Sequence, residues 1–160
     1  MKHLQNIKRK ILSDERFDEW LNNERHTIQK LVFTNGCFDI IHRGHVVYLT
    51  QAADAGSHFM VALNTDHSVK LNKGDSRPLQ DQYSRALIVA AFECVDFVVL
   101  FDEKTPANLI KKVVPDILVK GGDYNVRDIV GYDTVTNAGG EVRTIDFVDG
   151  YSTSGLIEKF

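Results

Sequence analysis

Short apolar runs alternate with longer segments of helical spacing along most of the chain. The runs are rich in β-branched and aromatic residues, which is typical of strands, and they occupy residues 30–34, 57–63, 97–100, 117–119 and 141–146. Helices are predicted between and after them, at residues 44–55, 66–71, 82–92, 105–114, 129–137 and 155–160. Because strands that are separated by helices pair in parallel, the pattern predicts an α/β fold: a Rossmann-like, doubly wound, parallel five-stranded sheet with helices on both faces.

The first 29 residues are highly charged and lack a strand pattern. Apolar residues recur there at helical spacing: Leu4, Ile7 and Ile11, then Phe17, Trp20 and Leu21. The spacing predicts one or two helices, which either pack on the domain through Phe17 and Trp20 or form a subunit contact. We therefore divide the chain into an N-terminal helical extension, residues 1–29, and one domain, residues 30–160.

Composition and charge argue against several classes of protein. A net charge of −3 and a pI near 6.0 disfavour general nucleic-acid binding, which needs a basic face. Cys37 and Cys94 lie far apart in the sequence, so neither a disulfide framework nor a structural zinc site is expected. No apolar run approaches the roughly 20 residues of a membrane span, and the polar N-terminus lacks a signal-peptide pattern. We expect a cytoplasmic protein without a nucleic-acid or membrane partner.

The unusual polar residues follow the predicted strands. In doubly wound sheets, ligands bind at the carboxyl ends of the strands. The loops that begin there are predicted to converge, and they comprise residues 35–43, 64–77, 101–105, 120–124 and 147–154.

The first of these loops has the pattern of an anion site. An apolar run leads into a turn that contains Gly36, and a helix begins near Gly44 with His42 and His45 around it. Free backbone N–H groups and the positive end of the helix dipole favour an anion at such a place. Histidines spaced i, i+3 can point at one object, and towards a triphosphate they act as donors that take up developing charge.

Two other interpretations of the histidines remain open at this point. Asp39, His42 and His45 form Asp-x-x-His-x-x-His, a spacing that suits a transition metal. No further His/Cys cluster completes such a shell, so no resident metal is expected. Alternatively, the two histidines only cap the start of a helix.

Motifs in a fixed order along the chain carry a resemblance to a known superfamily. They are Gly36-Cys37-Phe38-Asp39, His42-Arg43-Gly44-His45, Asn64-Thr65-Asp66, Arg77-Pro78, Glu93-Cys94-Val95-Asp96, Lys120-Gly121-Gly122-Asp123-Tyr124 and Gly150-Tyr151-Ser152-Thr153-Ser154. The histidine motif resembles the HxGH signature of the nucleotidyltransferases. Over about residues 31–160, the whole set closely resembles the D-glycero-D-manno-heptose 1-phosphate adenylyltransferases, which occur free or as the second half of a bifunctional kinase/adenylyltransferase.

The resemblance implies a nucleotide-binding half of the site. Its catalytic residues are His42, His45 and Lys120, and its nucleotide-binding residues are Thr34, Asn35, Gly36, Cys37, Phe38, His42, His45, Lys120, Gly121, Asp123, Tyr151, Ser152, Thr153 and Ser154. A lysine at a strand end before two glycines can reach nucleotide phosphates, although it can also extend into solvent. Hydroxyl groups at a helix start suit the β- and γ-phosphates, although one of them serves as an ordinary N-cap.

The resemblance also implies an acceptor half. Its residues are Asp39, Asn64, Asp66, Lys70, Lys73, Arg77 and Arg85. The three cations around residues 70–77 suit the phosphate of the acceptor. Other interpretations are an Asx turn at Asp39, a helix N-cap at Asp66, a solvated charged loop, and an Arg85 that pairs with a carboxylate such as Asp96.

The reaction implied is transfer of AMP from ATP, with Mg²⁺, to a sugar 1-phosphate. The product is ADP-heptose for lipopolysaccharide or another surface glycan, and the resemblance favours a homodimer. Two alternatives stand beside it. One is a CTP-dependent glycerol-3-phosphate cytidylyltransferase, which shares the first and last motifs, and the other is a non-catalytic nucleotide-binding module.

Overall fold

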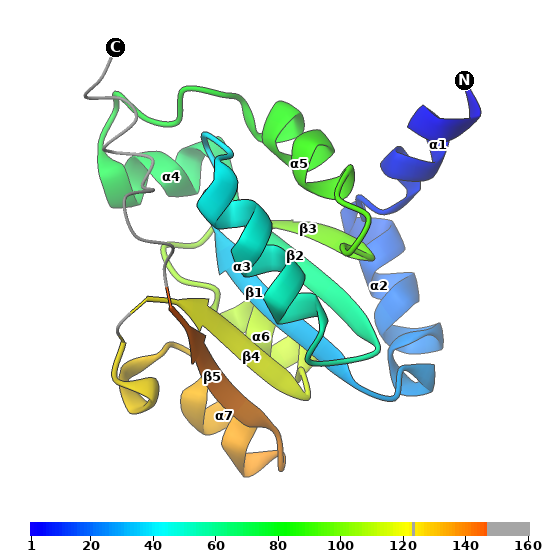
Figure 1. Ribbon diagram of the computed structural model, residues 1–160, viewed down its shortest axis with the longest axis vertical. Helices are drawn as coiled ribbons and strands as arrows, with labels where there is room; N and C mark the ends of the chain where they lie inside the picture. The colour runs from blue at the N-terminus through cyan, green and yellow to red at the C-terminus, as the bar shows by residue number, and fades with distance from the viewer. Residues whose placement is uncertain (123, 147–160) are drawn as a thin grey trace.

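The computed structural model describes residues 1–122 and 124–146. Its centre is a sheet of five parallel strands in the spatial order β3-β2-β1-β4-β5 (Figure 1). The strands are β1 (Leu31–Gly36), β2 (His58–Asn64), β3 (Phe97–Phe101), β4 (Ile117–Gly121) and β5 (Glu141–Ile145). The chain moves outward from β1 to β3 and then crosses back to β4, so the strand order switches between β1 and β4. The predicted fold class is confirmed.

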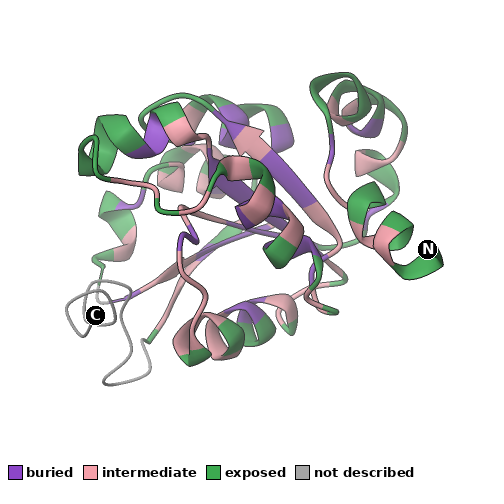
Figure 2. Cartoon of the chain, turned by 90° about the horizontal axis from the view of Figure 1, so that it is seen from above, coloured by how far each residue is buried: buried purple, intermediate pink, exposed green. Residues whose placement is uncertain are grey.

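Different helices cover the two faces of the sheet. Alternate strand residues point to opposite faces, so Val32 packs with α3 (Arg43–Ala53) and α5 (Gln82–Ala90), whereas Phe33 packs with α2 (Asp14–Asn23), α6 (Ala107–Val113) and α7 (Tyr132–Asn137). The other helices within the described residues are α1 (Lys2–Arg9), α4 (Asp66–Lys73) and the short 3₁₀ turns η1 (Arg25–Thr27) and η2 (Val126–Asp128). Figure 2 shows buried residues concentrated in the central strands and exposed residues on the outer sides of the helices.

The strands extend further than the apolar runs predict. β1 continues to Gly36 instead of ending at residue 34, because Asn35 and Gly36 still pair with Ala62 and Leu63 of β2. β4 likewise continues to Gly121. α3 ends at Ala53, two residues before the predicted end, and α7 begins only at Tyr132. The last predicted helix, residues 155–160, lies outside the described residues.

The N-terminal segment covers the edge of the sheet at β3. Val98 donates a backbone hydrogen bond to Lys10 (2.8 Å) and accepts one from Leu12 (2.9 Å), which forms a parallel bridge beyond the outer strand. Trp20 of α2 is fully buried and packs on Phe97. The segment thereby satisfies backbone groups that an edge strand exposes. None of the described helices is long and apolar enough to cross a membrane.

Candidate functional site

The two histidines meet at the first turn of α3. His42 is the N-cap residue of this helix, and its extended backbone lets the chain turn into the helix. Nδ1 of His45 accepts a hydrogen bond from the backbone N–H of His42 (3.3 Å), and the ring centroids lie 3.9 Å apart. The structure therefore brings together the pair that the i, i+3 spacing predicts.

The hydrogen bond at Nδ1 determines which nitrogen of His45 can donate. Since Nδ1 accepts, the proton of the neutral ring sits on Nε2. Burial, followed by the positive charges of His42 and Lys73, lowers the pKa of His45 to about 4, and burial also lowers the pKa of His42. His45 is thus a neutral Nε2–H donor at pH 7, and a bound polyanion would shift its pKa back upwards.

A tight turn after β1 places the ring of Phe38 against the ring of His45. Phe38 has a φ of 49°, a left-handed conformation that is uncommon for residues other than glycine. Its ring is nearly buried and lies 5.3 Å from the ring of His45. A Cβ atom on Gly36 would lie 2.9 Å from the Phe38 ring, so the turn requires glycine there.

The carboxyl ends of β1, β2 and β4 meet beside this turn. Lys120 is the second-last residue of β4 and donates through Nζ to the carbonyl of Asn35 (3.1 Å). Burial lowers the pKa of Lys120, while the nearby Cys37 raises it. The Cys37 thiol in turn donates to Oδ1 of Asn64 (3.6 Å). This edge of the sheet therefore holds a mostly buried cationic donor beside the turn after β1.

Thr34 has partners other than those expected of a nucleotide-binding residue. It is fully buried, and its hydroxyl lies 2.6 Å from that of Tyr48 and 3.0 Å from the carbonyl oxygen of Val119. Burial also raises the pKa of Tyr48. The Thr34 side chain therefore joins α3 to β1 and β4 and has no exposed surface for a ligand.

The carboxylate of Asp39 is likewise bound by other residues of the protein. The residue is 2% exposed, and its carboxylate accepts backbone hydrogen bonds from Leu79 (2.9 and 3.0 Å) and Gln80 (2.9 Å). Nη2 of Arg77 completes its surroundings at 2.8 Å. Instead of meeting a substrate hydroxyl, Asp39 fixes the loop that precedes α5. Among the residues that the structure describes, no group of three His, Cys, Asp or Glu side chains is placed to hold a metal ion.

The start of α4 differs from the sequence interpretation in its cap. Thr65 is the N-cap and accepts from the backbone N–H of Ser68 (3.1 Å), so Asp66 is the first helical residue instead of the cap. Asn64 is buried and donates to the Ser68 hydroxyl (2.8 Å). Asn64, at the end of β2, and Thr65, directly after it, are therefore both hydrogen-bonded to Ser68.

Arg85 is fully buried, and its carboxylate partner is Asp66, at 2.7 Å from Nη2. The pairing with Asp96 is wrong, because Asp96 accepts from the backbone N–H of Phe59 near the other end of β2. The phosphate-binding interpretation of Arg85 does not fit its burial.

The exposed cations of the acceptor half lie on α4. Lys70 and Lys73 are exposed in its last two turns, and Gly74, with a φ of 86°, follows the helix. The charge of Lys73 acts on His45, which places this lysine on the histidine side of α4. Arg77 is largely buried by its pairing with Asp39. Lys70 and Lys73 are therefore the accessible members of the predicted cluster.

Some predicted site residues fall outside the described part of the chain. They are Asp123, Tyr151, Ser152, Thr153 and Ser154. Gly121 ends β4, and Gly122 has a φ of 109°, which suits glycine.

Sequence reasoning missed two residues that shape the site. Gln80 donates to the backbone carbonyl of Asp39 as well as to its carboxylate, and Tyr48 contacts both Thr34 and Val119. Their partners are 14 to 71 positions away in the sequence, so no local spacing marks them.

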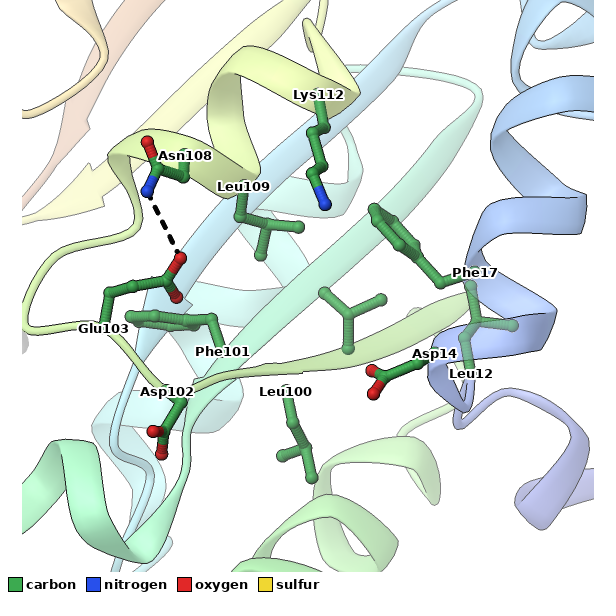
Figure 3. Close-up of a pocket in the computed structure, with 11 residues that line it drawn as sticks. Leu12, Asp14, Phe17, Leu100, Phe101, Asp102, Glu103, Asn108, Leu109 and Lys112 are labelled. Atoms are coloured by element: carbon green, nitrogen blue, oxygen red, sulfur yellow. Dashed lines mark hydrogen bonds between the residues drawn. The ribbon is translucent and has the colours of Figure 1, made fainter.

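A hollow of about 210 Å³ lies elsewhere, between α2, β3 and α6 (Figure 3). Apolar side chains such as Phe17 and Leu109 line it together with Asp14, Glu103 and Lys112. None of the predicted site residues borders it. The candidate site is thus the edge where β1, β2 and β4 end, and not this hollow.

Comparison with known proteins assigns the same region to one family. The sequence profile of the cytidylyltransferase-like family matches residues 33–158. The bifunctional protein HldE of Azorhizobium caulinodans is 55% identical over 130 residues, which are 81% of this chain and 27% of that protein. HldE of Campylobacter concisus is 49% identical over 154 residues, 96% of this chain and 31% of that protein. The chain thus spans less than a third of the length of these relatives.

Two solved structures share the architecture. The lipopolysaccharide core biosynthesis protein of Thermoplasma volcanium has a TM-score of 0.61 at 27% identity, over 77% of this chain and 98% of that one. The pantoate–β-alanine ligase of Francisella tularensis, solved with an ATP ligand and β-alanine, has a TM-score of 0.66 at 14% identity, over 94% and 73% of the two chains. The second likeness is one of fold.

Proposed function

Because the chain belongs to the cytidylyltransferase-like family of nucleotidyltransferases, we propose that it transfers AMP from ATP to D-glycero-D-manno-heptose 1-phosphate, giving ADP-heptose and pyrophosphate. The observation that carries the proposal is the His42–His45 pair at the start of α3, with a neutral Nε2–H donor on His45. The motif set from Gly36 to Tyr124, which resembles the heptose adenylyltransferases, and the HldE relatives support the choice of substrates.

The proposed reaction is a direct in-line displacement. An oxygen of the sugar phosphate attacks the α-phosphorus of ATP, a new P–O bond forms, and the bond to the bridging oxygen breaks as pyrophosphate leaves. Nε2–H of His45, the His42 ring and the ammonium of Lys120 stabilise the charge that moves onto the phosphate oxygens. Mg²⁺ enters as the counter-ion of ATP, bound to its phosphates.

The acceptor is bound from the α4 side of the site. Lys70 and Lys73 are exposed there, and an ammonium group attracts a phosphate as a point charge. Two ion pairs, Asp39 with Arg77 and Asp66 with Arg85, stabilise the loops and the start of α4 on this side. The acceptor phosphate is thus bound between α4 and His45.

The wider organisation of the chain follows the same reasoning. We propose that residues 30–160 form the nucleotidyltransferase domain, with residues 1–29 as an extension, and that two copies form a homodimer. Light scattering after size exclusion measures the mass in solution, and a monomer at micromolar concentration contradicts the dimer.

The test crosses ATP and CTP with heptose 1-phosphate and glycerol 3-phosphate, and follows pyrophosphate release and product mass. We expect turnover with ATP and heptose 1-phosphate. Turnover only with CTP and glycerol 3-phosphate makes the chain a cytidylyltransferase. Nucleotide binding without pyrophosphate release from any pair makes it a binding module. A His45→Ala preparation, purified in parallel, controls for contaminating activity.

A further inference from the structure

Arg85 is hydrogen-bonded to two loops of the candidate site and to the first residue of α4. Nε donates to the Gln80 carbonyl (3.0 Å), Nη1 to the Cys37 carbonyl (2.7 Å) and Nη2 to the Asp66 carboxylate (2.7 Å). We propose that Arg85 is a positioning residue that joins the nucleotide half of the site to the acceptor half. The inference rests on the proposed function for its catalytic consequence, but its geometry is independent of the substrate.

Arg85 is fully buried, and all three nitrogens of its guanidinium group have hydrogen-bond partners. A buried guanidinium is costly unless its donors are paired, and here one carboxylate and two carbonyls pair with all three nitrogens. Its rigid planar fork fixes the relative orientation of the three acceptors, which a lysine cannot do. Loss of Arg85 therefore releases two loops and the start of α4 together.

The connection to the nucleotide half runs through the turn after β1. The Cys37 carbonyl that Arg85 binds directly precedes Phe38, whose left-handed backbone carries its ring against His45. On the other side of Phe38, Asp39 is bound to the loop before α5. The residues on both sides of Phe38 are thus fixed by hydrogen bonds. If the Cys37 carbonyl moves, the Phe38 ring that packs against His45 moves with it.

The connection to the acceptor half runs through α4. Asp66 is the first residue of that helix, and Lys70 and Lys73 are in its later turns. Arg85 therefore fixes the separation between His45, at the nucleotide phosphates, and the lysines at the acceptor phosphate. In a displacement reaction this separation sets the distance between the attacking oxygen and the phosphorus.

Arg25 provides a matched control. It donates to the carbonyls of Val113 (3.0 Å) and Val114 (2.6 Å) and to the carboxylate of Asp116 (3.2 Å), the same kinds of acceptor as those of Arg85. These residues lie before β4, at the amino edge of the sheet, away from the proposed site. Arg85→Met and Arg25→Met remove equivalent bonds, and only the first should affect turnover per folded molecule.

The first measurement is kcat and KM per folded molecule, with the folded fraction taken from urea denaturation. We expect Arg85→Met to lower kcat by about 10- to 100-fold relative to Arg25→Met, because small misplacements of reacting groups are costly. In the His45→Ala background the same substitution should change kcat by less than about 3-fold, since coupled residues are non-additive. Equal kcat for the two arginine variants, or losses that multiply in the double variant, overturns the proposal.

The second measurement needs no substrate and separates this inference from the proposed function. The ring resonances of His45, assigned with His45→Ala, should shift in Arg85→Met and stay in place in Arg25→Met. Unchanged resonances in both variants refute the positioning role even if the wild type is an active adenylyltransferase. Should Arg85→Met fail to fold, Arg85→Lys, which keeps a cation beside Asp66 but loses the fork, is judged by the same two criteria.

Discussion

Nδ1 of His45 accepts the backbone N–H of His42 at 3.3 Å, and this bond leaves Nε2 of His45 as the donor. One ring can thus cap the helix through Nδ1 and donate to a phosphate through Nε2. The helix-capping and the phosphate-binding interpretations of the sequence are therefore compatible. The same hydrogen bond stabilises the start of α3 and holds His45 in one tautomer, with its proton on Nε2.

Removal of the His45 donor is expected to slow the chemical step. His45→Ala should lower kcat by about 10²- to 10³-fold with little change in KM for ATP, the usual effect of losing a preorganised donor to a developing negative charge. His58→Ala is the control, because His58 lies at the start of β2 and stacks on Phe97. Pyrophosphate release is the measurement, and a kcat within 3-fold of wild type contradicts the role.

The low pKa of His45 predicts a pH dependence of stability. In the unfolded chain His45 binds a proton below about pH 6.5, whereas the folded protein accepts it only near pH 4. The unfolded state therefore binds more protons between these values, so stability falls as pH drops from about 6.5 to about 4. Urea denaturation of His45→Gln should show a smaller fall over that window than wild type. An identical pH profile for both proteins shows that His45 is not the group responsible.

Lys120 is expected to act through its charge. Lys120→Met keeps most of the side-chain volume but removes the ammonium, so kcat/KM for ATP should fall by about 10- to 100-fold, as for loss of one charge-stabilising donor. Lys111→Met, on the exposed side of α6, is the matched control. Equal kcat/KM for the two variants assigns Lys120 a structural role at the Asn35 carbonyl.

Asp39 is expected to matter first for stability. Asp39→Asn keeps the shape but removes the charge beside Arg77 and turns an NH₂ group towards backbone N–H donors of Leu79 and Gln80. Loss of one partner of a buried pair costs about 3–5 kcal/mol in the free energy of unfolding. Glu19→Gln removes a 3.8 Å surface pairing with Arg16 and should cost less than about 1 kcal/mol. Equal urea midpoints for the two variants would refute the bracing role of Asp39.

Local pattern was sufficient for the elements of the fold. The apolar runs gave the five strands in order, because buried parallel strands need continuous β-branched and apolar residues. The i, i+3 spacing gave the His42–His45 contact, because one helical turn brings these positions together whatever the rest of the chain does. The apolar pattern alone ends β1 and β4 too early, because polar residues and glycine stay in a strand where the neighbouring strand continues the hydrogen-bonded ladder.

The sequence by itself thus determined the strands, the helices and the histidine pair, which follow from near neighbours in the chain. It also determined the family resemblance, which follows from the order of the motifs along the chain. Only the tertiary structure decided what Thr34, Asp39 and Arg85 do. Apart from the Gln80 carbonyl, which is five positions from Arg85, their partners lie 14 to 85 positions away. A hydroxyl, carboxylate or guanidinium has the same sequence signature whether it faces a ligand or a buried backbone. Packing brought those groups together, and burial then required that their charges and hydrogen bonds be satisfied within the protein.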